Sequence, residues 1–184
     1  MIKYYLSIII LVLFFLLLWI PQLLAQETNR NFFYNFYINH TVFAEKEALD
    51  SMLKSFQLFS SLFTDVYMQG DYIIPLHGQT MQELIDYLAE GFENDLASDI
   101  IETYFTWNCE LNKPVVIPCD LIPVLTDLDR AEIKSFTDCY GNIYFYRFYD
   151  NCYYQGDRYY YQVSTYFTGY TWKIKSIRFE SILK

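Results

Sequence analysis

The chain has 184 residues, enough for one domain, and its 22 acidic against 13 basic residues give a net charge of −9. This balance excludes the common nucleic-acid-binding classes, whose affinity comes from Lys and Arg contacts to phosphate, and it disfavours docking on anionic lipid. It favours a basic partner or a cationic surface, although a solubilising coat of carboxylates explains most of such a charge.

Residues 1–25 have the pattern of an export signal. Lys3 is followed by an almost wholly apolar run over residues 4–20, and Ala25 is a small residue suited to cleavage. An uncleaved membrane anchor is the alternative, because the run approaches the roughly 20 residues that span a bilayer. Both alternatives export the remaining chain and predict a secreted or cell-surface protein. Without Lys3 the mature part has 12 basic and 22 acidic residues, a net charge of −10.

The export signal is followed by an arm or linker over residues 26–40 and then by one predicted domain over residues 41–184. Residues 41–68 carry apolar side chains at steps of three and four, which predicts a long helix with one wide apolar stripe. Gly70 and Asp71 are expected to end this helix. The stripe is expected to face the core and to cover a sheet.

Two shorter helices are predicted next. Residues 80–83 (TMQE) form a capping box, in which the Thr hydroxyl and the Glu carboxylate each accept from the other residue's amide. The helix that it opens carries apolar residues at helical spacing through residue 92. Asn94 or Asp95 is expected to cap a third helix that runs through residue 105. The pair predicts a compact αα-hairpin.

From Trp107 onward the composition favours strands. Residues 113–118 are bounded by prolines and predict a short edge strand, and residues 121–125 form another brief piece. Residues 131–137 and 143–149 are predicted to be strands joined by a Gly-containing turn.

The last 26 or so residues predict the hairpin that completes the sheet. Residues 158–167 alternate aromatic and β-branched side chains with period two, and Thr168-Gly169-Tyr170 is a short Gly-containing connection. The apolar phase of the last strand changes near Ser176, which predicts a β-bulge there. Helices first and an antiparallel meander afterwards predict an α+β fold, with the helices packed on one face of a curved antiparallel sheet.

Four cysteines lie in the exported part, at Cys109, Cys119, Cys139 and Cys152. An even number in an exported chain permits two disulfides in three connectivities, and sequence proximity favours Cys109–Cys119 and Cys139–Cys152. No Cys-x-x-Cys pair is present, so the spacing excludes a thioredoxin motif and a zinc ribbon. Phosphate-binding glycine motifs are also absent. We predict no metal site and no cofactor.

Candidate catalytic groups are few. His40 lies in the arm and His77 in a turn, and neither neighbours a nucleophile in the sequence, so we predict no catalytic residue and no enzyme. The loop that carries Asp120, Asp127 and Asp129 lacks the glycine of an EF-hand. Asp127 suits a helix or turn cap. The three carboxylates are otherwise candidate contacts to a partner protein.

Aromatic residues make up 21% of the chain, with 19 tyrosines. Both faces of residues 158–167 carry Tyr, and only one face can point at the helices. Tyr144, Tyr146, Tyr160 and Tyr166 are therefore candidates for an exposed or cleft-lining aromatic row, a kind of surface that suits protein or sugar contacts. The alternative is that these side chains simply cover the sheet.

The order of the segments carries a family resemblance: an export signal, a long helix, then TMQELIDYLAEGFENDLASDIIETYF, a proline-bounded strand and a closing WKIKSIRF strand. Over about residues 72–182 this resembles the secreted inhibitors of peptidoglycan-cleaving DL-endopeptidases of bacilli and clostridia, whose C-terminal part is similar to cystatin-like or NTF2-like folds. The resemblance implies a non-catalytic protein whose wedge or loop blocks the active cleft of a cell-wall hydrolase. The four cysteines and the arm depart from the family's pattern, and no inhibitory residue is carried over.

The leading prediction is an exported, non-catalytic protein that binds and inhibits a cell-wall peptidase through the Asp120–Asp129 loop and the aromatic row. The first alternative is an NTF2-like module that binds a small molecule or glycan on the concave aromatic face of the sheet. An open cavity on that face favours the alternative, and a filled face counts against it. A hydrolase is the second alternative, and it needs His77 or a close acid pair in such a cavity.

Overall fold

The computed structural model describes residues 42–120, 122–151 and 155–182, and the chain divides into two compact units, 1–44 and 45–184. The predicted export signal and arm lie outside the described residues. Of the first unit only residues 42–44 are described, and they are helical. In the described ranges no helix is both long enough and apolar enough to cross a membrane.

The second unit begins with a helix over residues 45–64. Its buried apolar side chains recur at steps of three and four: Ala48, Met52, Leu53, Phe56, Phe59 and Leu62. The prediction that the helix continues to residue 68 was wrong, because β1 (Val66–Gln69) pairs with β2 (Tyr72–Pro75). Gly70, with a φ of 62°, turns this hairpin and does not end the helix.

Helix α2 (Met81–Leu88) begins at the predicted cap. The Thr80 hydroxyl accepts from the amide of Glu83 at 3.1 Å. The Glu83 carboxylate accepts from the amide of Gln79, at 2.6 Å, and not from that of Thr80. The predicted start of the helix is therefore confirmed, and the reciprocal bond of the capping box is displaced by one residue.

Helix α3 (Asn94–Tyr104) begins without a side-chain cap, so the prediction that Asn94 or Asp95 caps it was wrong. The N-cap is Glu93, whose amide donates to the carbonyl of Ile174 at 2.8 Å. The amide of Ile174 donates in turn to the carbonyl of Gly91 at 2.9 Å. The helix start is thus fixed by bonds to a strand far along the sequence.

The next two strands form a separate hairpin. β3 (Phe105–Asn108) pairs antiparallel with β4 (Lys113–Val116). This confirms the predicted short strand, which ends at residue 116 and not at 118. Phe105 lies in a strand and not in the predicted helix. The Lys113 ammonium donates to the Tyr67 hydroxyl at 2.7 Å and so links this hairpin to the β1–β2 hairpin.

The predicted Cys109–Cys119 disulfide was wrong, and Cys109, Cys119 and Cys139 are exposed free thiols. Cys109 lies in the turn of the β3–β4 hairpin, whereas Cys119 follows the far end of β4. Four strand residues between these ends span about 13 Å. A disulfide tolerates a Cα separation of only about 7 Å. Cys152, the predicted partner of Cys139, lies outside the described residues.

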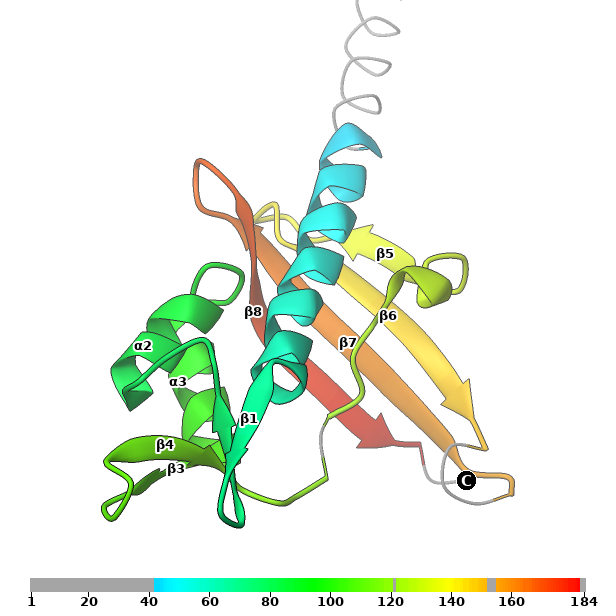
Figure 1. The fold of residues 1–184 in the computed structure, drawn as a ribbon. Coiled ribbons are helices and arrows are strands. Elements are labelled where there is room, and N and C mark those ends of the chain that lie inside the picture. Colours follow the sequence, from blue (N-terminus) through cyan, green and yellow to red (C-terminus); the bar gives the residue numbers. More distant parts are fainter. Residues whose placement is uncertain (1–41, 121, 152–154, 183–184) are drawn as a thin grey trace, which may run out of the picture. The chain divides into compact units, whose positions relative to one another are not determined.

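The main sheet has four antiparallel strands in chain order (Figure 1): β5 (Lys134–Thr137), β6 (Ile143–Asp150), β7 (Arg158–Phe167) and β8 (Trp172–Ser181). The predicted meander is therefore confirmed. Residues 122–125 are not a strand, contrary to the prediction.

The strand predicted over residues 131–137 begins only at Lys134. Asp127–Asp129 form a 3-10 helix, where the Thr126 amide and hydroxyl both donate to Oδ2 of Asp129 at 2.7 and 3.0 Å. The amides of Glu132 and Ile133 then donate to the carbonyl of Asp129. These turn bonds hold the chain out of the sheet until residue 134.

The predicted bulge in β8 is confirmed. Ser164 pairs with Ser176 and the next residue, Thr165, pairs with Ile174. Lys175 is therefore the extra residue of the bulge. It accounts for the phase change of apolar side chains along β8.

The helix over residues 45–64 crosses one face of the main sheet, called here the inner face (Figure 1). Phe56 lies in this interface, with its ring centroid 6.3 Å from those of both Phe92 and Tyr161. The buried side chains of β6, β7 and β8 on the inner face are Ile143, Phe145, Tyr161, Val163, Thr165, Trp172 and Ile174. The helices pack against sheets, and the predicted α+β class is confirmed.

Candidate functional site

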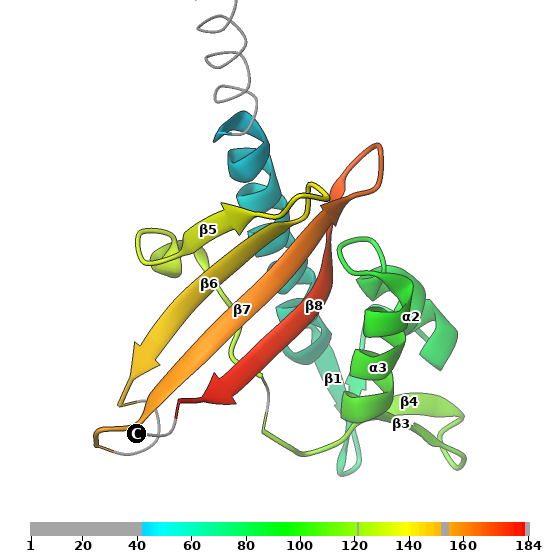
Figure 2. The same ribbon diagram turned by 180° about the vertical axis from the view of Figure 1, so that it is seen from behind.

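Five aromatic side chains lie together on the outer face of the main sheet, opposite the helix: Phe136, Tyr144, Tyr146, Phe148 and Tyr160. We call them the outer aromatic row. Figure 2 views the sheet from this side, with the helix behind it. The Phe136 and Tyr144 rings are stacked at 4.8 Å, and Tyr160 lies 6.1 Å from Tyr146 and 5.4 Å from Phe148.

The row follows from strand alternation and register. Tyr144, Tyr146 and Phe148 are alternate residues of β6 and therefore share a face. Phe148 lies opposite Tyr160, and Tyr144 lies opposite Phe136. Sequence reasoning missed both phenylalanines. The period of two along β6 was a sufficient signal for Phe148, whereas Phe136 needed the pairing register of β5 with β6.

Polar groups frame the row. The Arg158 guanidinium lies over the Phe148 ring at 4.7 Å, and the Gln162 amide donates to the Tyr160 hydroxyl at 2.9 Å. The Tyr144 hydroxyl donates to the Asp138 carboxylate at 3.2 Å. Desolvation by burial raises the pKa of Tyr144 and of Tyr160, so both hydroxyls are neutral at physiological pH. The row therefore offers apolar rings with hydrogen-bonding groups at their edges.

Part of the row is open to solvent. Phe136 is 45% exposed and Phe148 is 39% exposed, while the three tyrosines are half-buried. Aromatic side chains bury a large area at low entropic cost, so a partner that covers these rings gains affinity from them.

Tyr166, the fourth predicted tyrosine, lies six residues beyond Tyr160 on β7, opposite Lys173. The Lys173 ammonium donates to the carbonyl of Ala89 at 2.6 Å. Burial, with the nearby charge of Glu93, raises the pKa of Tyr166. Tyr166 thus lies toward the turn between α2 and α3, and the structure does not place it beside Tyr160.

The three candidate aspartates differ in their surroundings. Asp120 is exposed. Asp127 forms an ion pair with Arg130 at 2.8 Å, and Arg130 also pairs with Asp50 of the helix at 2.7 Å. Arg130 therefore links the end of the 3-10 helix to the long helix, and Asp127 holds the Arg130 guanidinium.

Asp129 is held more firmly than Asp127, because it pairs with Arg147 of the inner sheet face and its side chain is only 17% exposed. Arg147 also pairs with Glu132 at 2.6 Å and lies over the Tyr149 ring at 4.2 Å. Arg130 and Arg147 thus connect the loop to the helix and to the sheet, and Asp120 is the freer candidate for partner contact.

The inner face beneath the helix is filled with side chains, which counts against the alternative of an open concave pocket. Tyr161 and Val163 are fully buried there, and Phe56 of the helix packs against Tyr161. Close packing of this kind leaves no room for a ligand between Phe56 and Tyr161.

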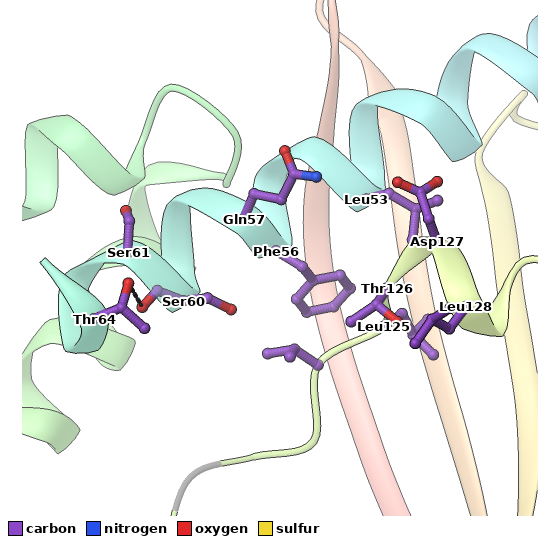
Figure 3. A pocket seen from close by; sticks show the side chains of 11 residues that line it. Leu53, Phe56, Gln57, Ser60, Ser61, Thr64, Leu125, Thr126, Asp127 and Leu128 are labelled. Atoms are coloured by element: carbon purple, nitrogen blue, oxygen red, sulfur yellow. Dashed lines mark hydrogen bonds between the residues drawn. The ribbon is translucent and has the colours of Figure 1, made fainter.

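A cavity of about 430 Å³ lies beside the inner face, between the helix and residues 124–128 (Figure 3). Leu53, Phe56 and Leu125 give it an apolar floor, and Gln57 and Thr126 contribute polar groups. Its acidic group, Asp127, is already paired with Arg130. The cavity therefore brings together no acid–base pair among the residues that line it.

Tyr161 carries a buried hydroxyl that has no hydrogen-bond partner among the described residues, and burial raises its pKa. An unsatisfied buried hydroxyl costs roughly 1–3 kcal/mol. We therefore expect Tyr161→Phe to raise the free energy of unfolding by about 1 kcal/mol, measured by urea denaturation. Tyr104→Phe is the matched control: its hydroxyl accepts from the amide of Ile122 at 3.2 Å, so this change is expected to destabilise. A loss of stability in Tyr161→Phe would mean that the hydroxyl has a bound partner.

His77 lies beside an acidic residue and an aromatic ring. Nε2 of His77 lies 2.9 Å from Asp65, and the ring stacks on Tyr87 at 4.2 Å. The Tyr87 hydroxyl shares a hydrogen bond of 2.8 Å with the hydroxyl of Ser61. These contacts fasten α2 to the end of the long helix. His40 lies outside the described residues, and within them no group of three or more His, Cys, Asp or Glu side chains could hold a metal ion.

Comparison with protein-family models, with curated proteins and with solved structures gives no match.

Proposed function

We propose that this chain is an exported, non-catalytic protein that binds a cell-wall peptidase of the DL-endopeptidase type through the outer aromatic row and inhibits it. The observation that carries this proposal is the row itself, five aromatic side chains on a sheet face that no described element covers (Figure 2). The class of partner comes from the resemblance of residues 72–182 to secreted inhibitors of such enzymes.

The composition of the row supports a protein partner. Interface cores are enriched in Tyr, Phe and Arg and depleted in Lys and Glu. The row contains three Tyr and two Phe, with Arg158 stacked on Phe148 at its margin. A sheet face also suits a broad contact, whereas small molecules are bound in concave sites that enclose them.

The charge supports a basic partner surface. The chain carries a net charge of −9, and complementary charge mainly raises the association rate. Asp120 is exposed and remains the acidic loop residue most available to such a partner.

The test is an inhibition assay with a purified DL-endopeptidase and peptidoglycan. We expect the wild-type protein to inhibit, and the double variant Phe136→Ser with Phe148→Ser to raise the inhibition constant by about tenfold or more, since each ring is a candidate hot spot. Both side chains are partly exposed, so the fold is expected to survive.

Leu128→Ser is the control, because Leu128 is 93% exposed and lies in the 3-10 helix, away from the outer face. It is expected to inhibit as the wild type does. Absence of inhibition by the wild type, or equal inhibition by the double variant, would reject the proposal. Binding to soluble glycan fragments in place of the enzyme would also reject it.

A further inference from the structure

β8 is the last strand of the main sheet, and its outer edge is covered only in part. Ile174 is bonded there to Gly91 and Glu93, and Phe92 forms an isolated bridge with it. Beyond the bulge, no described strand pairs with the edge over residues 177–181 (Figure 2).

The register shows which backbone groups of this edge point away from β7. The amide of Ile182 donates to the carbonyl of Arg158 at 2.7 Å, so Ile182 directs its backbone groups toward β7. In an antiparallel pair this direction alternates, so Arg178 and Glu180 also bond toward β7. Ile177, Phe179 and Ser181 therefore direct their N–H and C=O groups outward.

Proteins usually have features at the edges of their sheets that prevent pairing with a strand of another chain. β5, the other edge of the sheet, has only four residues and carries Lys134. β8 has ten residues, and its bulge at Lys175 lies before the open part. The open part is therefore a template for another strand.

We propose that the strand which occupies this edge is the β8 of a second copy of this chain, paired antiparallel about a twofold axis at Phe179. In that register Arg178 lies opposite Glu180 of the second copy, and Glu180 lies opposite its Arg178. Within one chain Nε of Arg178 already lies 3.4 Å from Oε1 of Glu180, and both side chains are exposed, at 61% and 60%, on the outer face of the sheet. A second copy in this register therefore extends one ion pair into a cluster of four alternating charges. Opposite charges directly across an antiparallel pair stabilise it. The segment Arg-Phe-Glu is thus complementary to itself in this one register.

Such a pairing is isologous and closes as a dimer. It joins the two sheets edge to edge, so both outer aromatic rows lie on the same side of the joined sheet. The pairing depends on the backbone and on two exposed charges, and it does not depend on the identity of the partner proposed above.

The test measures the mass of the complete 184-residue chain by sedimentation velocity in a mild non-ionic detergent, over a range of concentrations. The wild type is expected to form dimers. Arg178→Glu and Glu180→Arg each place like charges opposite each other twice in the dimer, so each is expected to weaken association by about tenfold or more. The double variant with both changes restores opposite charges and is expected to regain the dimer.

Three results would contradict the proposed dimer. A wild-type chain that stays monomeric would overturn it. So would single variants that dimerise like the wild type, because association would then use another part of the chain, including its apolar N-terminal segment. Failure of the double variant to recover association would also overturn it. Thermal unfolding midpoints are compared at a low concentration at which all four proteins are monomeric, because dimerisation itself raises the midpoint. Equal midpoints there would show that the charges act on association and not on folding.

Discussion

Phe56→Ala is expected to lower the free energy of unfolding by about 3–5 kcal/mol, the range found when a fully buried Phe is truncated. Phe56 is 1% exposed and joins three elements, with its ring 6.3 Å from both Phe92 before α3 and Tyr161 of β7. Truncation removes contacts to both partners and leaves a void that the close-packed layer can fill only in part.

The measurement is urea denaturation followed by near-ultraviolet circular dichroism, which reports aromatic packing. Gln57→Ala, at the exposed next position of the same helix, is the control and is expected to stay within about 0.5 kcal/mol of the wild type. If Phe56→Ala costs less than about 1 kcal/mol, the helix does not pack on the sheet as described.

Gly91→Ala is expected to cost about 2–3 kcal/mol, because the added methyl overfills a tight contact. A Cβ at this position would lie 2.4 Å from Oγ and 2.7 Å from Cβ of Ser55, whose side chain is buried on the long helix. The carbonyl of Gly91 accepts from the amide of Ile174, so the backbone cannot move away without loss of that bond. The glycine is required here by close approach and not by a positive φ.

Two variants test this account. Glu90→Ala, at the exposed preceding position, is expected to leave the thermal unfolding midpoint nearly unchanged. Ser55→Gly combined with Gly91→Ala is expected to recover part of the lost stability, since it removes two of the three crowded atoms. Additive losses in the double variant would show that Ser55 is not the source of the strain.

The part of the outer aromatic row whose residues lie on one strand was predictable from the sequence. Period two along β6 places Tyr144 and Tyr146 on one face, and the same rule puts Tyr160 on a single face of β7. The side of the sheet that remains open depends on where the helix packs. The membership of Phe136 depends on the register of β5 with β6, which no local pattern specifies.

The ion pairs of Asp127 and Asp129 involve residues, directly or through Arg130, that lie far from them in the sequence. Asp129 and Arg147 are 18 positions apart, and Asp50 lies 80 positions before Arg130. A sequence shows which carboxylates exist, but their ion-pair partners depend on which distant segments the fold brings beside them. For the same reason, proximity in sequence suggested a Cys109–Cys119 disulfide, although the extended strand β4 between these residues holds them apart.

The sequence alone determined the α+β class, the antiparallel meander, the start of α2 and the bulge in β8, because each follows from periodicity or local hydrogen bonds. Tertiary structure alone decided the start of α3, the strand at Val66–Gln69 and the free edge of β8. These features depend on backbone hydrogen bonds between different strands or between a strand and a loop. The free energy of such bonds depends on which segments become neighbours, and local composition does not specify that.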